Sequence, residues 1–408
     1  MANREGTLLV NPVAITEQLN QQGLKQWWVA EQIGIDRATL SRWLNGRVKW
    51  AKQENIKAIA EILQCKPNDL VICDEINLET SKQDQKHAAE LIKKRELKEL
   101  IRNTEDWELF ESILTTTIHR NLPQNILGFI YIELAVAAWR QLKIKKAKSY
   151  LERAKAIADK CGHLSIYYNV LLNEGTLLLF EGNLTLAQMK FQTCVAQSVD
   201  VNAHSSALAN LAETFHKQGL LEDAMDTVSQ LIKLHQSNPS IYKDTSTAMA
   251  FLSKASYLLE LRHYKEAFSY AEKSIQISQF KQFMRGIHYG KIVQAAIGAA
   301  LGYNTEKLFL EAHKTFLPDN DDPCFHFYGA VVAYHSSDYQ LALNRLHKAE
   351  MMSTDFLAEL AIIKSFQSQI LETVHNHKQS NTAKQKALQL FKQTGAFERL
   401  KRFPNPIF

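Results

Sequence analysis

The residues from Arg37 to Arg42 carry side chains suited to binding a polyanion. Two arginines enclose small and hydroxylic residues, in the order Arg37, Ala38, Thr39, Ser41 and Arg42. Guanidinium groups can donate paired hydrogen bonds to phosphates and guanine edges, and hydroxyl groups can contact phosphates or bases. Between residues 36 and 57, six basic residues accompany two acidic ones. This segment could therefore contact both the backbone and the base edges of duplex DNA.

Local signals predict two short helices that would position these side chains. The first covers residues 26–32, and Gly34 permits the tight turn that follows it. The second covers residues 37–44, with Asp36 expected to cap its first turn through its carboxylate. Gly46 ends this helix, as a residue with left-handed backbone does. Residues 37–42 would then lie on the outward face of the second helix.

The segment from about residue 10 to residue 72 resembles the lambda-repressor-like (XRE) DNA-binding family. The resemblance rests on the start at Gln26, the A-x-x-I-G-I-D run, the T-L-S-R-W run and the N-G turn. It implies a five-helix domain over residues 10–73 with double-stranded DNA as its partner. The pair Trp27 and Trp28 departs from the family pattern, and we expect one of the two rings to pack inward while the other serves a dimer or interdomain contact.

The same resemblance implies a role for each side chain of the interface. Gln26 and Arg47 would hold the DNA backbone, while the outward residues of the second helix would face the bases. Lys49 would belong to the same interface. The alternative for each cationic side chain is an ordinary solvated helix face. The predicted DNA-binding residues are Gln26, Arg37, Ala38, Thr39, Ser41, Arg42, Arg47 and Lys49.

Length and composition predict a second, larger helical unit. A chain of 408 residues far exceeds one DNA-binding domain, and only 15 Gly and 8 Pro interrupt it. We therefore expect an all-α protein. The stretch over residues 74–103 begins as a polar segment without apolar periodicity and continues as a charged, helix-prone one, so it is predicted to be a linker with a connecting helix. Residues 104–400 would form the second unit.

Charge, cysteine usage and hydropathy narrow the class of protein. The net charge of +5 is too small to argue for nucleic acid by itself. Five scattered cysteines without a C-x-x-C pair indicate thiols in a reducing compartment. Neither a signal sequence nor an 18-residue apolar run is present. These features predict a cytoplasmic protein that does not enter a membrane.

Internal repeats define the second unit. Helix-turn-helix patterns recur around five alanines with spacings of 40, 37, 43 and 75, namely Ala147, Ala187, Ala224, Ala267 and Ala342. The last spacing predicts a sixth, degenerate repeat anchored near Lys307. Twelve residues before each anchor stands a small residue: Ala135, Gly175, Ala212, Ala255, Ala295 and Ala330. Small residues at both positions would let paired antiparallel helices approach closely.

This pattern resembles the tetratricopeptide repeat, although the period is longer than usual and the Trp-Leu-Gly opening is absent. The resemblance implies about six repeats over residues 121–353, with atypical repeats at the ends around Trp107 and Ala383. It also implies a right-handed α-solenoid whose groove is lined by the first helix of each pair. In such an array each repeat contacts only its neighbours, so small rotations would add along the chain.

Two asparagines mark this groove. Asn173 and Asn210 both stand fourteen residues before an anchor. The resemblance implies that such asparagines bond the main chain of an extended peptide, and a carboxamide can donate and accept at once. The alternative is plain polar surface. The other predicted peptide-binding residues are Arg140, Asn169, Thr176, Phe180, Glu213, His216, Lys217 and Tyr289, and Tyr334 and His335 are also expected in the groove.

The chain carries no sequence motif of a common catalytic or metal site. H-E-x-x-H, G-x-x-x-x-G-K-[ST], G-x-G-x-x-G and G-x-S-x-G are all missing. His375 and His377 read as a solvated turn, and the acidic run at 319–322 lacks the ligand spacing of a calcium loop. We therefore expect no enzyme activity, no metal and no cofactor.

The two modules together resemble the RRNPP group of peptide-sensing regulators of bacteria and phages. The resemblance implies a transcription regulator whose DNA binding is modulated by a short signalling peptide. A dimer is expected, because two recognition helices about 34 Å apart read a near-palindromic operator. Two alternatives remain: a DNA-tethered scaffold that docks a protein partner, and a phage-type repressor that uses the solenoid only for assembly.

Overall fold

The computed structural model describes residues 7–71, 97, 101, 104, 106–118, 122–198, 200–239, 244–314 and 322–402. The chain divides into two compact units. Unit 1 comprises Met1–Glu174 with Ala196–His204, and unit 2 comprises Gly175–Val195 with Ser205–Phe408. The predicted linker and connecting helix over 74–103 fall outside the described residues, apart from Leu97 and Ile101.

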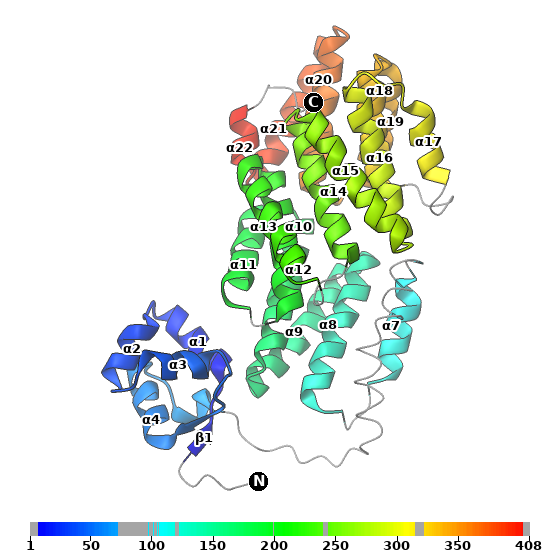
Figure 1. The fold of residues 1–408 in the computed structure, drawn as a ribbon. Coiled ribbons are helices and arrows are strands. Elements are labelled where there is room, and N and C mark those ends of the chain that lie inside the picture. Colours follow the sequence, from blue (N-terminus) through cyan, green and yellow to red (C-terminus); the bar gives the residue numbers. More distant parts are fainter. Residues whose placement is uncertain are drawn as a thin grey trace. The chain divides into compact units, whose positions relative to one another are not determined.

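The N-terminal domain of unit 1 is a small helical domain with one short sheet (Figure 1). Its elements are β1 (Thr7–Leu9), α1 (Pro12–Gln21), α2 (Gln26–Gln32), α3 (Arg37–Leu44), β2 (Trp50–Lys52), α4 (Gln53–Ile62) and the 3-10 helix η1 (Pro67–Leu70). The five predicted helical elements are thus four α-helices and one 3-10 helix. The sheet was not predicted: β1 pairs antiparallel with β2, with Thr7 opposite Lys52.

Helical spacing of apolar residues builds the core of this domain. Leu40 and Trp43 are buried on one face of α3, as predicted. Gly34 has a φ of +70° and Gly46 a φ of +66°, so both turns use the left-handed backbone that glycine adopts readily. The prediction for Asp36 was wrong in one respect: it occupies the N-cap position of α3, but its side chain makes no capping hydrogen bond.

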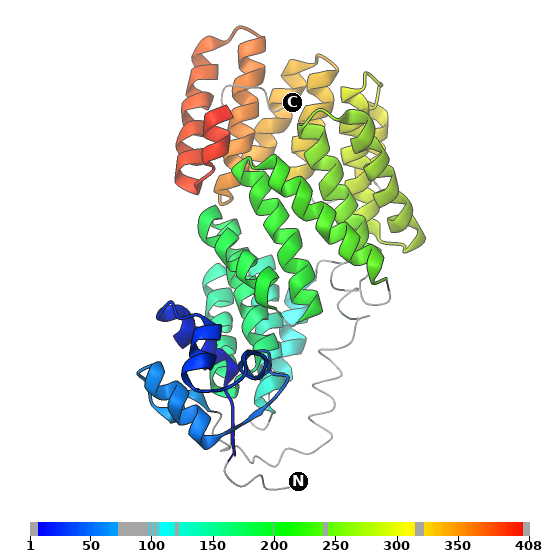
Figure 2. The ribbon, with the colours of Figure 1, turned by 60° about the vertical axis from the view of Figure 1, so that its left-hand side comes forward.

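Stacked antiparallel helix pairs follow along the chain (Figures 1 and 2). The pairs are α8 (Gln124–Arg140) with α9 (Ile144–Cys161), α10 (Leu164–Phe180) with α11 (Leu184–Gln197), α12 (Val201–Gln218) with α13 (Leu221–Ser237), α14 (Asp244–Glu260) with α15 (Tyr264–Phe280), α16 (Met284–Ala300) with α17 (Glu306–Lys314), α18 (Pro323–His335) with α19 (Tyr339–Met352), and α20 (Leu357–Thr373) with α21 (His377–Thr394). Helix α7 (Trp107–Thr116) precedes them and α22 (Phe397–Arg402) follows. The region around Ala383 is a full helix pair rather than an atypical end.

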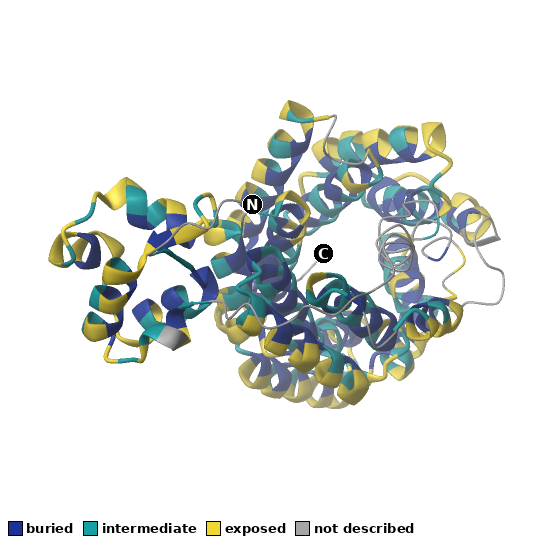
Figure 3. Cartoon of the chain, turned by 90° about the horizontal axis from the view of Figure 1, so that it is seen from below, coloured by how far each residue is buried: buried dark blue, intermediate teal, exposed yellow. Residues whose placement is uncertain are grey.

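The small repeat positions lie where the paired helices touch. All five anchor alanines are fully buried, and so are the small residues twelve positions earlier. At Gly175, an added Cβ would lie 2.7 Å from the Phe191 ring, so the close approach of α10 to α11 requires a glycine. Figure 3 shows the same pattern along the chain, with buried residues on the sides of helices that face neighbours.

The anchor of the degenerate repeat was wrongly placed. Lys307 has a side chain that is 91% exposed, whereas Phe309 is fully buried at the fourth position of α17, the position that the alanines hold in the other second helices. The turn before α17 is longer than the others. Thr305 closes it by donating a hydrogen bond from its hydroxyl to the carbonyl of Ala295 (2.8 Å), and this insertion shifts the register by two residues.

The repeats of unit 2 contact more than their neighbours in sequence. Phe356, just before α20, packs on Phe180 with ring centroids 5.5 Å apart. Leu357 and Thr394 lie against Gly182, where an added Cβ would be 3.2 Å and 3.0 Å from them. The expectation of neighbour-only contacts was therefore wrong for unit 2, because its last helices return to the turns of its first ones. In the part of the chain that is described, no helix combines the length and apolarity needed to span a membrane.

Candidate functional site

Helix α3 presents the predicted contact residues to solvent. Arg37, Ala38 and Arg42 are exposed, and Thr39 and Ser41 are partly so. The opposite face of the helix is held in the domain core. Since the core fixes the helix and leaves this face free, the guanidinium groups and hydroxyls are available to phosphates and base edges.

The other three predicted residues are exposed on the same domain. Gln26 is the first residue of α2, and Arg47 and Lys49 lie in the segment between α3 and β2. Two backbone hydrogen bonds hold this segment: Val48 donates to the carbonyl of Arg42 (3.1 Å), and Val10 donates to the carbonyl of Lys49 (2.9 Å). The domain thus has three exposed cationic or amide side chains outside α3, and none of them is part of its core.

The expectation for the two tryptophans was wrong. Neither ring packs inward: Trp27 is 47% exposed and Trp28 is 37% exposed. Instead, the guanidinium carbon of Arg37 lies over the Trp27 ring, 5.3 Å from its centroid. The core of the domain is already filled by aliphatic residues and Trp43, so α2 has no inward position for a second large ring.

Within unit 1, the DNA-binding domain contacts the first full repeat. Asn11 caps α1 by accepting from the amide of Ala14 (3.2 Å), and its Nδ2 donates to the carbonyl of Asp159 on α9 (2.7 Å). Burial, reinforced by the nearby charge of Asp159, raises the pKa of Glu17 on α1. No sequence pattern indicated this contact, because it joins residues that are 148 positions apart.

The predicted groove residues of unit 1 make local contacts. Asn173 is 9% exposed, and its Nδ2 donates to the carbonyl of Asn169 (2.8 Å). Asn169 in turn donates to the carbonyl of Ser165 (2.8 Å). Arg140 is exposed, with its guanidinium carbon 4.2 Å from the Trp139 ring centroid and 5.5 Å from that of Trp107. Each side chain therefore has partners on its own or an adjacent helix.

Unit 2 brings most of the remaining predicted groove residues onto α12 and its neighbours. Asn210 donates from Nδ2 to the hydroxyl of Thr176 (3.0 Å), which links α12 to α10. Glu213 accepts from the hydroxyl of Tyr257 on α14 (3.1 Å). His216 stacks on Tyr257, with ring centroids 4.6 Å apart. The first helices of successive pairs thus join in one polar network.

Lys217 is the cation at the centre of this network. Its Nζ lies 3.6 Å from a carboxylate oxygen of Glu213 and donates a hydrogen bond to Glu359 on α20. Burial would lower the pKa of Lys217, but the charges of Glu359 and Glu213 outweigh it and raise the pKa. The ammonium group is therefore charged in the folded protein. The second carboxylate oxygen of Glu359 is buried and has no hydrogen-bond partner among the described residues.

Arg399 of α22 completes the network from the C-terminal side. Its guanidinium donates to both carboxylate oxygens of Glu260 (2.6 and 3.1 Å) and to the carbonyls of His216 (2.7 Å) and Lys217 (3.2 Å). Its side chain is 7% exposed. Burial would raise the pKa of Glu260, but Arg399 and the hydrogen bond from His216 hold it well below the usual range.

The sequence analysis missed Glu260, Glu359 and Arg399. A signal for Glu260 was present, because it stands seven residues before Ala267, as Lys217 does before Ala224. Arg399 had no such signal, since it belongs to no repeat and meets Glu260 across 139 positions of the chain.

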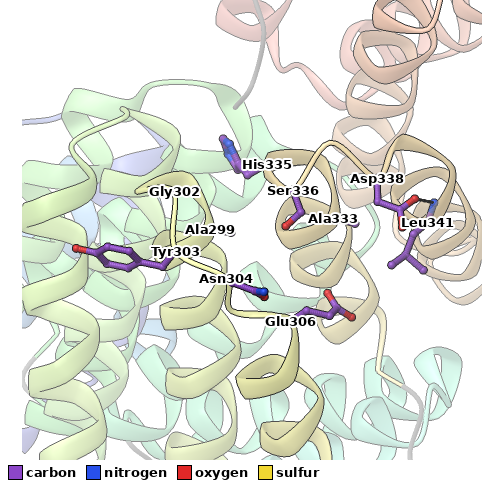
Figure 4. A pocket seen from close by; sticks show the side chains of 10 residues that line it. All are labelled: Ala299, Gly302, Tyr303, Asn304, Glu306, Ala333, His335, Ser336, Asp338 and Leu341. Atoms are coloured by element: carbon purple, nitrogen blue, oxygen red, sulfur yellow. Dashed lines mark hydrogen bonds between the residues drawn. The ribbon is translucent and has the colours of Figure 1, made fainter.

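The last predicted residues lie elsewhere in unit 2. Tyr289 on α16 donates its hydroxyl to Asp322, and burial together with this carboxylate raises its pKa. Tyr334 accepts from Nε2 of Gln369 (3.1 Å). His335 lines a pocket of about 370 Å³ between the α16–α17 and α18–α19 turns, and burial lowers its pKa (Figure 4).

The two carboxylates that line this pocket already have hydrogen-bond partners. Glu306 already accepts two hydrogen bonds from Arg345, and Asp338 caps α19 by accepting from the amide of Leu341 (3.0 Å). Figure 4 shows these side chains on the two turns that flank the pocket. The pocket lies between adjoining turns and shares no lining residue with the network around Lys217.

One pair has the spacing of a catalytic dyad. Ser205 Oγ lies 2.7 Å from His235 Nε2, and His235 Nδ1 lies 3.2 Å from the hydroxyl of Thr247. Both members are buried, at 8% and 3% exposure, and the third group is a hydroxyl rather than a carboxylate. This arrangement links α12, α13 and α14.

Within the described ranges, no group of three His, Cys, Asp or Glu side chains is placed to hold a metal ion.

Residues 14–75 match the model of the Cro/C1-type helix-turn-helix DNA-binding domain. No curated protein sequence matches the chain. The protein therefore combines an N-terminal helix-turn-helix DNA-binding domain with a region of stacked helix pairs like tetratricopeptide repeats.

Several solved structures resemble the chain at low sequence identity. A Rap protein complexed with competence and sporulation factor matches with a TM-score of 0.58 and 11% identity, covering 94% of this chain and 99% of that one. Aspartyl phosphate phosphatase F from Bacillus subtilis matches with a TM-score of 0.52 and 10% identity, covering 92% and 93%. The apo form of the quorum sensor NprR from B. thuringiensis matches with a TM-score of 0.48 and 15% identity, covering 93% and 97%. The likeness to the first two shows the fold of the repeats.

Proposed function

We propose that the protein is a cytoplasmic transcription regulator. It binds a near-palindromic DNA operator as a homodimer through residues 10–73, and a short peptide held by its repeat region modulates this binding. The observation that carries the proposal is the outward face of α3, where Arg37 and Arg42 are exposed on a helix-turn-helix domain joined to a repeat region. A similar solved structure is a Rap protein complexed with competence and sporulation factor, which supports a signalling ligand for the repeat region.

We expect Arg42→Ala and Arg47→Ala to affect DNA binding differently. A base-reading arginine should contribute about 1–3 kcal/mol at its preferred site, so Arg42→Ala should weaken binding to the selected sequence and relax the preference at one base pair. Loss of a phosphate-contacting arginine, as in Arg47→Ala, should weaken binding to all sequences alike. It should also reduce the slope of log affinity against log salt concentration by about one. Both are measured on DNA selected by the wild-type protein from a random pool.

Arg402→Ala is the matched control for loss of a positive charge, because Arg402 is exposed on α22, outside the DNA-binding domain. The proposed roles fail if Arg42→Ala keeps the wild-type ratio of selected to random DNA. A dimer should appear in the selection as a repeated half-site. Light scattering of the complex checks this, and one protein chain per DNA would contradict it.

The ligand proposal rests on the first helices of the repeats. Asn173 and Asn210 keep carboxamide groups at equivalent repeat positions, and each donates one N–H within the protein. A carboxamide has a second N–H and an oxygen with two lone pairs, so each side chain retains capacity for a peptide main chain. The network of Glu213, Lys217 and Tyr257 supplies charged and phenolic groups on neighbouring turns of α12 and α14. These groups favour a ligand with its own hydrogen-bonding backbone.

We expect Asn210→Ala and Asn173→Ala each to weaken peptide binding by about 1–3 kcal/mol. Each change would leave a polar group of the bound peptide buried without a hydrogen-bond partner. The probe is the tightest binder that the wild-type protein selects from a library of short random peptides, measured by calorimetry. Asn344→Ala is the control, since Asn344 is exposed on the second helix of its pair.

Unchanged peptide affinity in both variants would contradict the groove assignment. If the wild-type protein selects no peptide but retains a second protein chain at fixed stoichiometry, the repeat region is a protein-docking scaffold. DNA affinity in the absence of peptide should be the same for wild type, Asn173→Ala and Asn210→Ala, because neither residue belongs to the DNA-binding domain.

A further inference from the structure

Trp27 occupies a position that the folding of the domain does not explain. It lies in the first turn of α2 and leaves 47% of its surface in contact with water. A large apolar side chain gains stability when it is buried, so an exposed tryptophan on a small domain suggests a contact outside the core. Among the described residues, the guanidinium group of Arg37 lies over the ring.

The partner of Trp27 is the first residue of the recognition helix. Arg37 begins α3, and its guanidinium carbon lies over the indole at 5.3 Å, within the distance of a favourable cation–π contact. Among residues 7–71, none of Arg42, Arg47 and Lys49 has such a contact with an aromatic ring. One arginine of the proposed interface is thus supported by a neighbouring helix, while the other cations are not.

Stacking and base recognition use different parts of the guanidinium group. The ring engages the flat face, whereas the five N–H donors lie at the edge and remain free to bond O6 and N7 of a guanine. An exposed arginine otherwise loses rotamer freedom when it binds DNA, and this loss weakens affinity. A ring that restricts Arg37 beforehand reduces the loss and fixes the direction of the donors.

We infer that Trp27 is a positioning residue for sequence recognition, which holds Arg37 so that its guanidinium edge reads one guanine of the operator. This inference rests on the proposed DNA-binding function. It assigns to Trp27 an effect on discrimination between sequences, which a residue that merely covers the domain surface would not have. It also predicts that the effect of Trp27 depends on the presence of Arg37.

The test compares full-length Trp27→Ala, Trp27→Phe, Arg37→Ala and the double variant on DNA selected by the wild-type protein and on random DNA. Trp27→Ala should weaken binding to the selected DNA by about two- to tenfold and leave random DNA nearly unchanged. It should relax the preference at the same base pair that Arg37→Ala relaxes. Trp27→Phe keeps a ring and should retain most of the discrimination.

Coupling between the two residues decides the outcome. In the Arg37→Ala background, removing Trp27 should cause little further loss. Trp28→Ala is the matched control, since Trp28 is exposed on the same turn and should leave discrimination intact. The inference is overturned if Trp27→Ala weakens selected and random DNA equally, or adds its full loss to that of Arg37→Ala. A wild-type protein that selects no sequence would overturn the proposed function itself, and the inference with it.

Discussion

Replacing Arg399 with alanine is expected to cause the largest loss of stability of any single change proposed for this protein. The guanidinium neutralises the buried carboxylate of Glu260 and satisfies the carbonyls of His216 and Lys217. Without it, Glu260 keeps only His216 as a partner in a buried site. Breaking a buried ion pair by removing one member costs about 3–5 kcal/mol. For a unit of this size, that corresponds to a fall in Tm of roughly 6–20 °C.

Differential scanning calorimetry of the full chain measures this effect. Arg402→Ala is the control, because Arg402 is exposed on the same short helix and should change Tm little. Arg399→Lys should restore only part of the stability, since an ammonium group cannot form the paired hydrogen bonds to Glu260. A Tm for Arg399→Ala within a degree of wild type would mean that the contact between α22 and α14 does not stabilise the protein.

Acidification is expected to destabilise unit 2 steeply. Glu260 and Glu350 both have pKa values below their usual value of 4.5: burial would raise them, but Arg399 and His216 outweigh it at Glu260, and Lys364 and Gln367 outweigh it at Glu350. The unfolded chain therefore takes up protons before the folded one does. The stabilisation is fully present above pH 4.5 and is lost as the pH falls from there toward the lowered values.

Thermal unfolding followed by circular dichroism over a pH series checks this expectation. His235 adds a milder loss that begins at higher pH, because burial lowers its pKa from 6.5 and protonation below that value favours the unfolded chain. Glu260→Gln should lower Tm at neutral pH and flatten its decline below pH 4.5. A wild-type Tm that stays constant from neutral pH to pH 3 would contradict the role assigned to these carboxylates.

The sequence predicted the DNA-binding domain well because its signals are local. Helices α2 and α3 begin and end at the predicted residues, since the turns at Gly34 and Gly46 depend on backbone preferences within a few positions. The strands β1 and β2 were not predicted, because each has only three residues and their pairing joins positions more than forty residues apart. The exposure of both Trp27 and Trp28 also could not be read from the sequence, because it depends on how completely other side chains fill the core.

The repeat region was predictable at the level of helix pairs and less so at the level of contacts. Small residues such as Gly175 mark the close approach of paired helices, and that requirement leaves a periodic trace. A two-residue insertion before α17 broke the period, and the anchor moved from Lys307 to Phe309. The meeting of Arg399 with Glu260 leaves no periodic trace, because it depends on the accumulated rotation of many helix pairs.

The return of the last helices to the first turns of unit 2 has a consequence for the evolution of such chains. An open array can gain or lose a repeat at little cost, because each new pair needs only a neighbour. Here Arg399 bonds Glu260, and Leu357 packs against Gly182. An extra or missing helix pair between these positions would separate the groups and break both contacts. Duplication or deletion of a whole repeat should therefore be far less tolerated than substitution within one. The number of helix pairs between α12 and α22 is a fixed property of this protein.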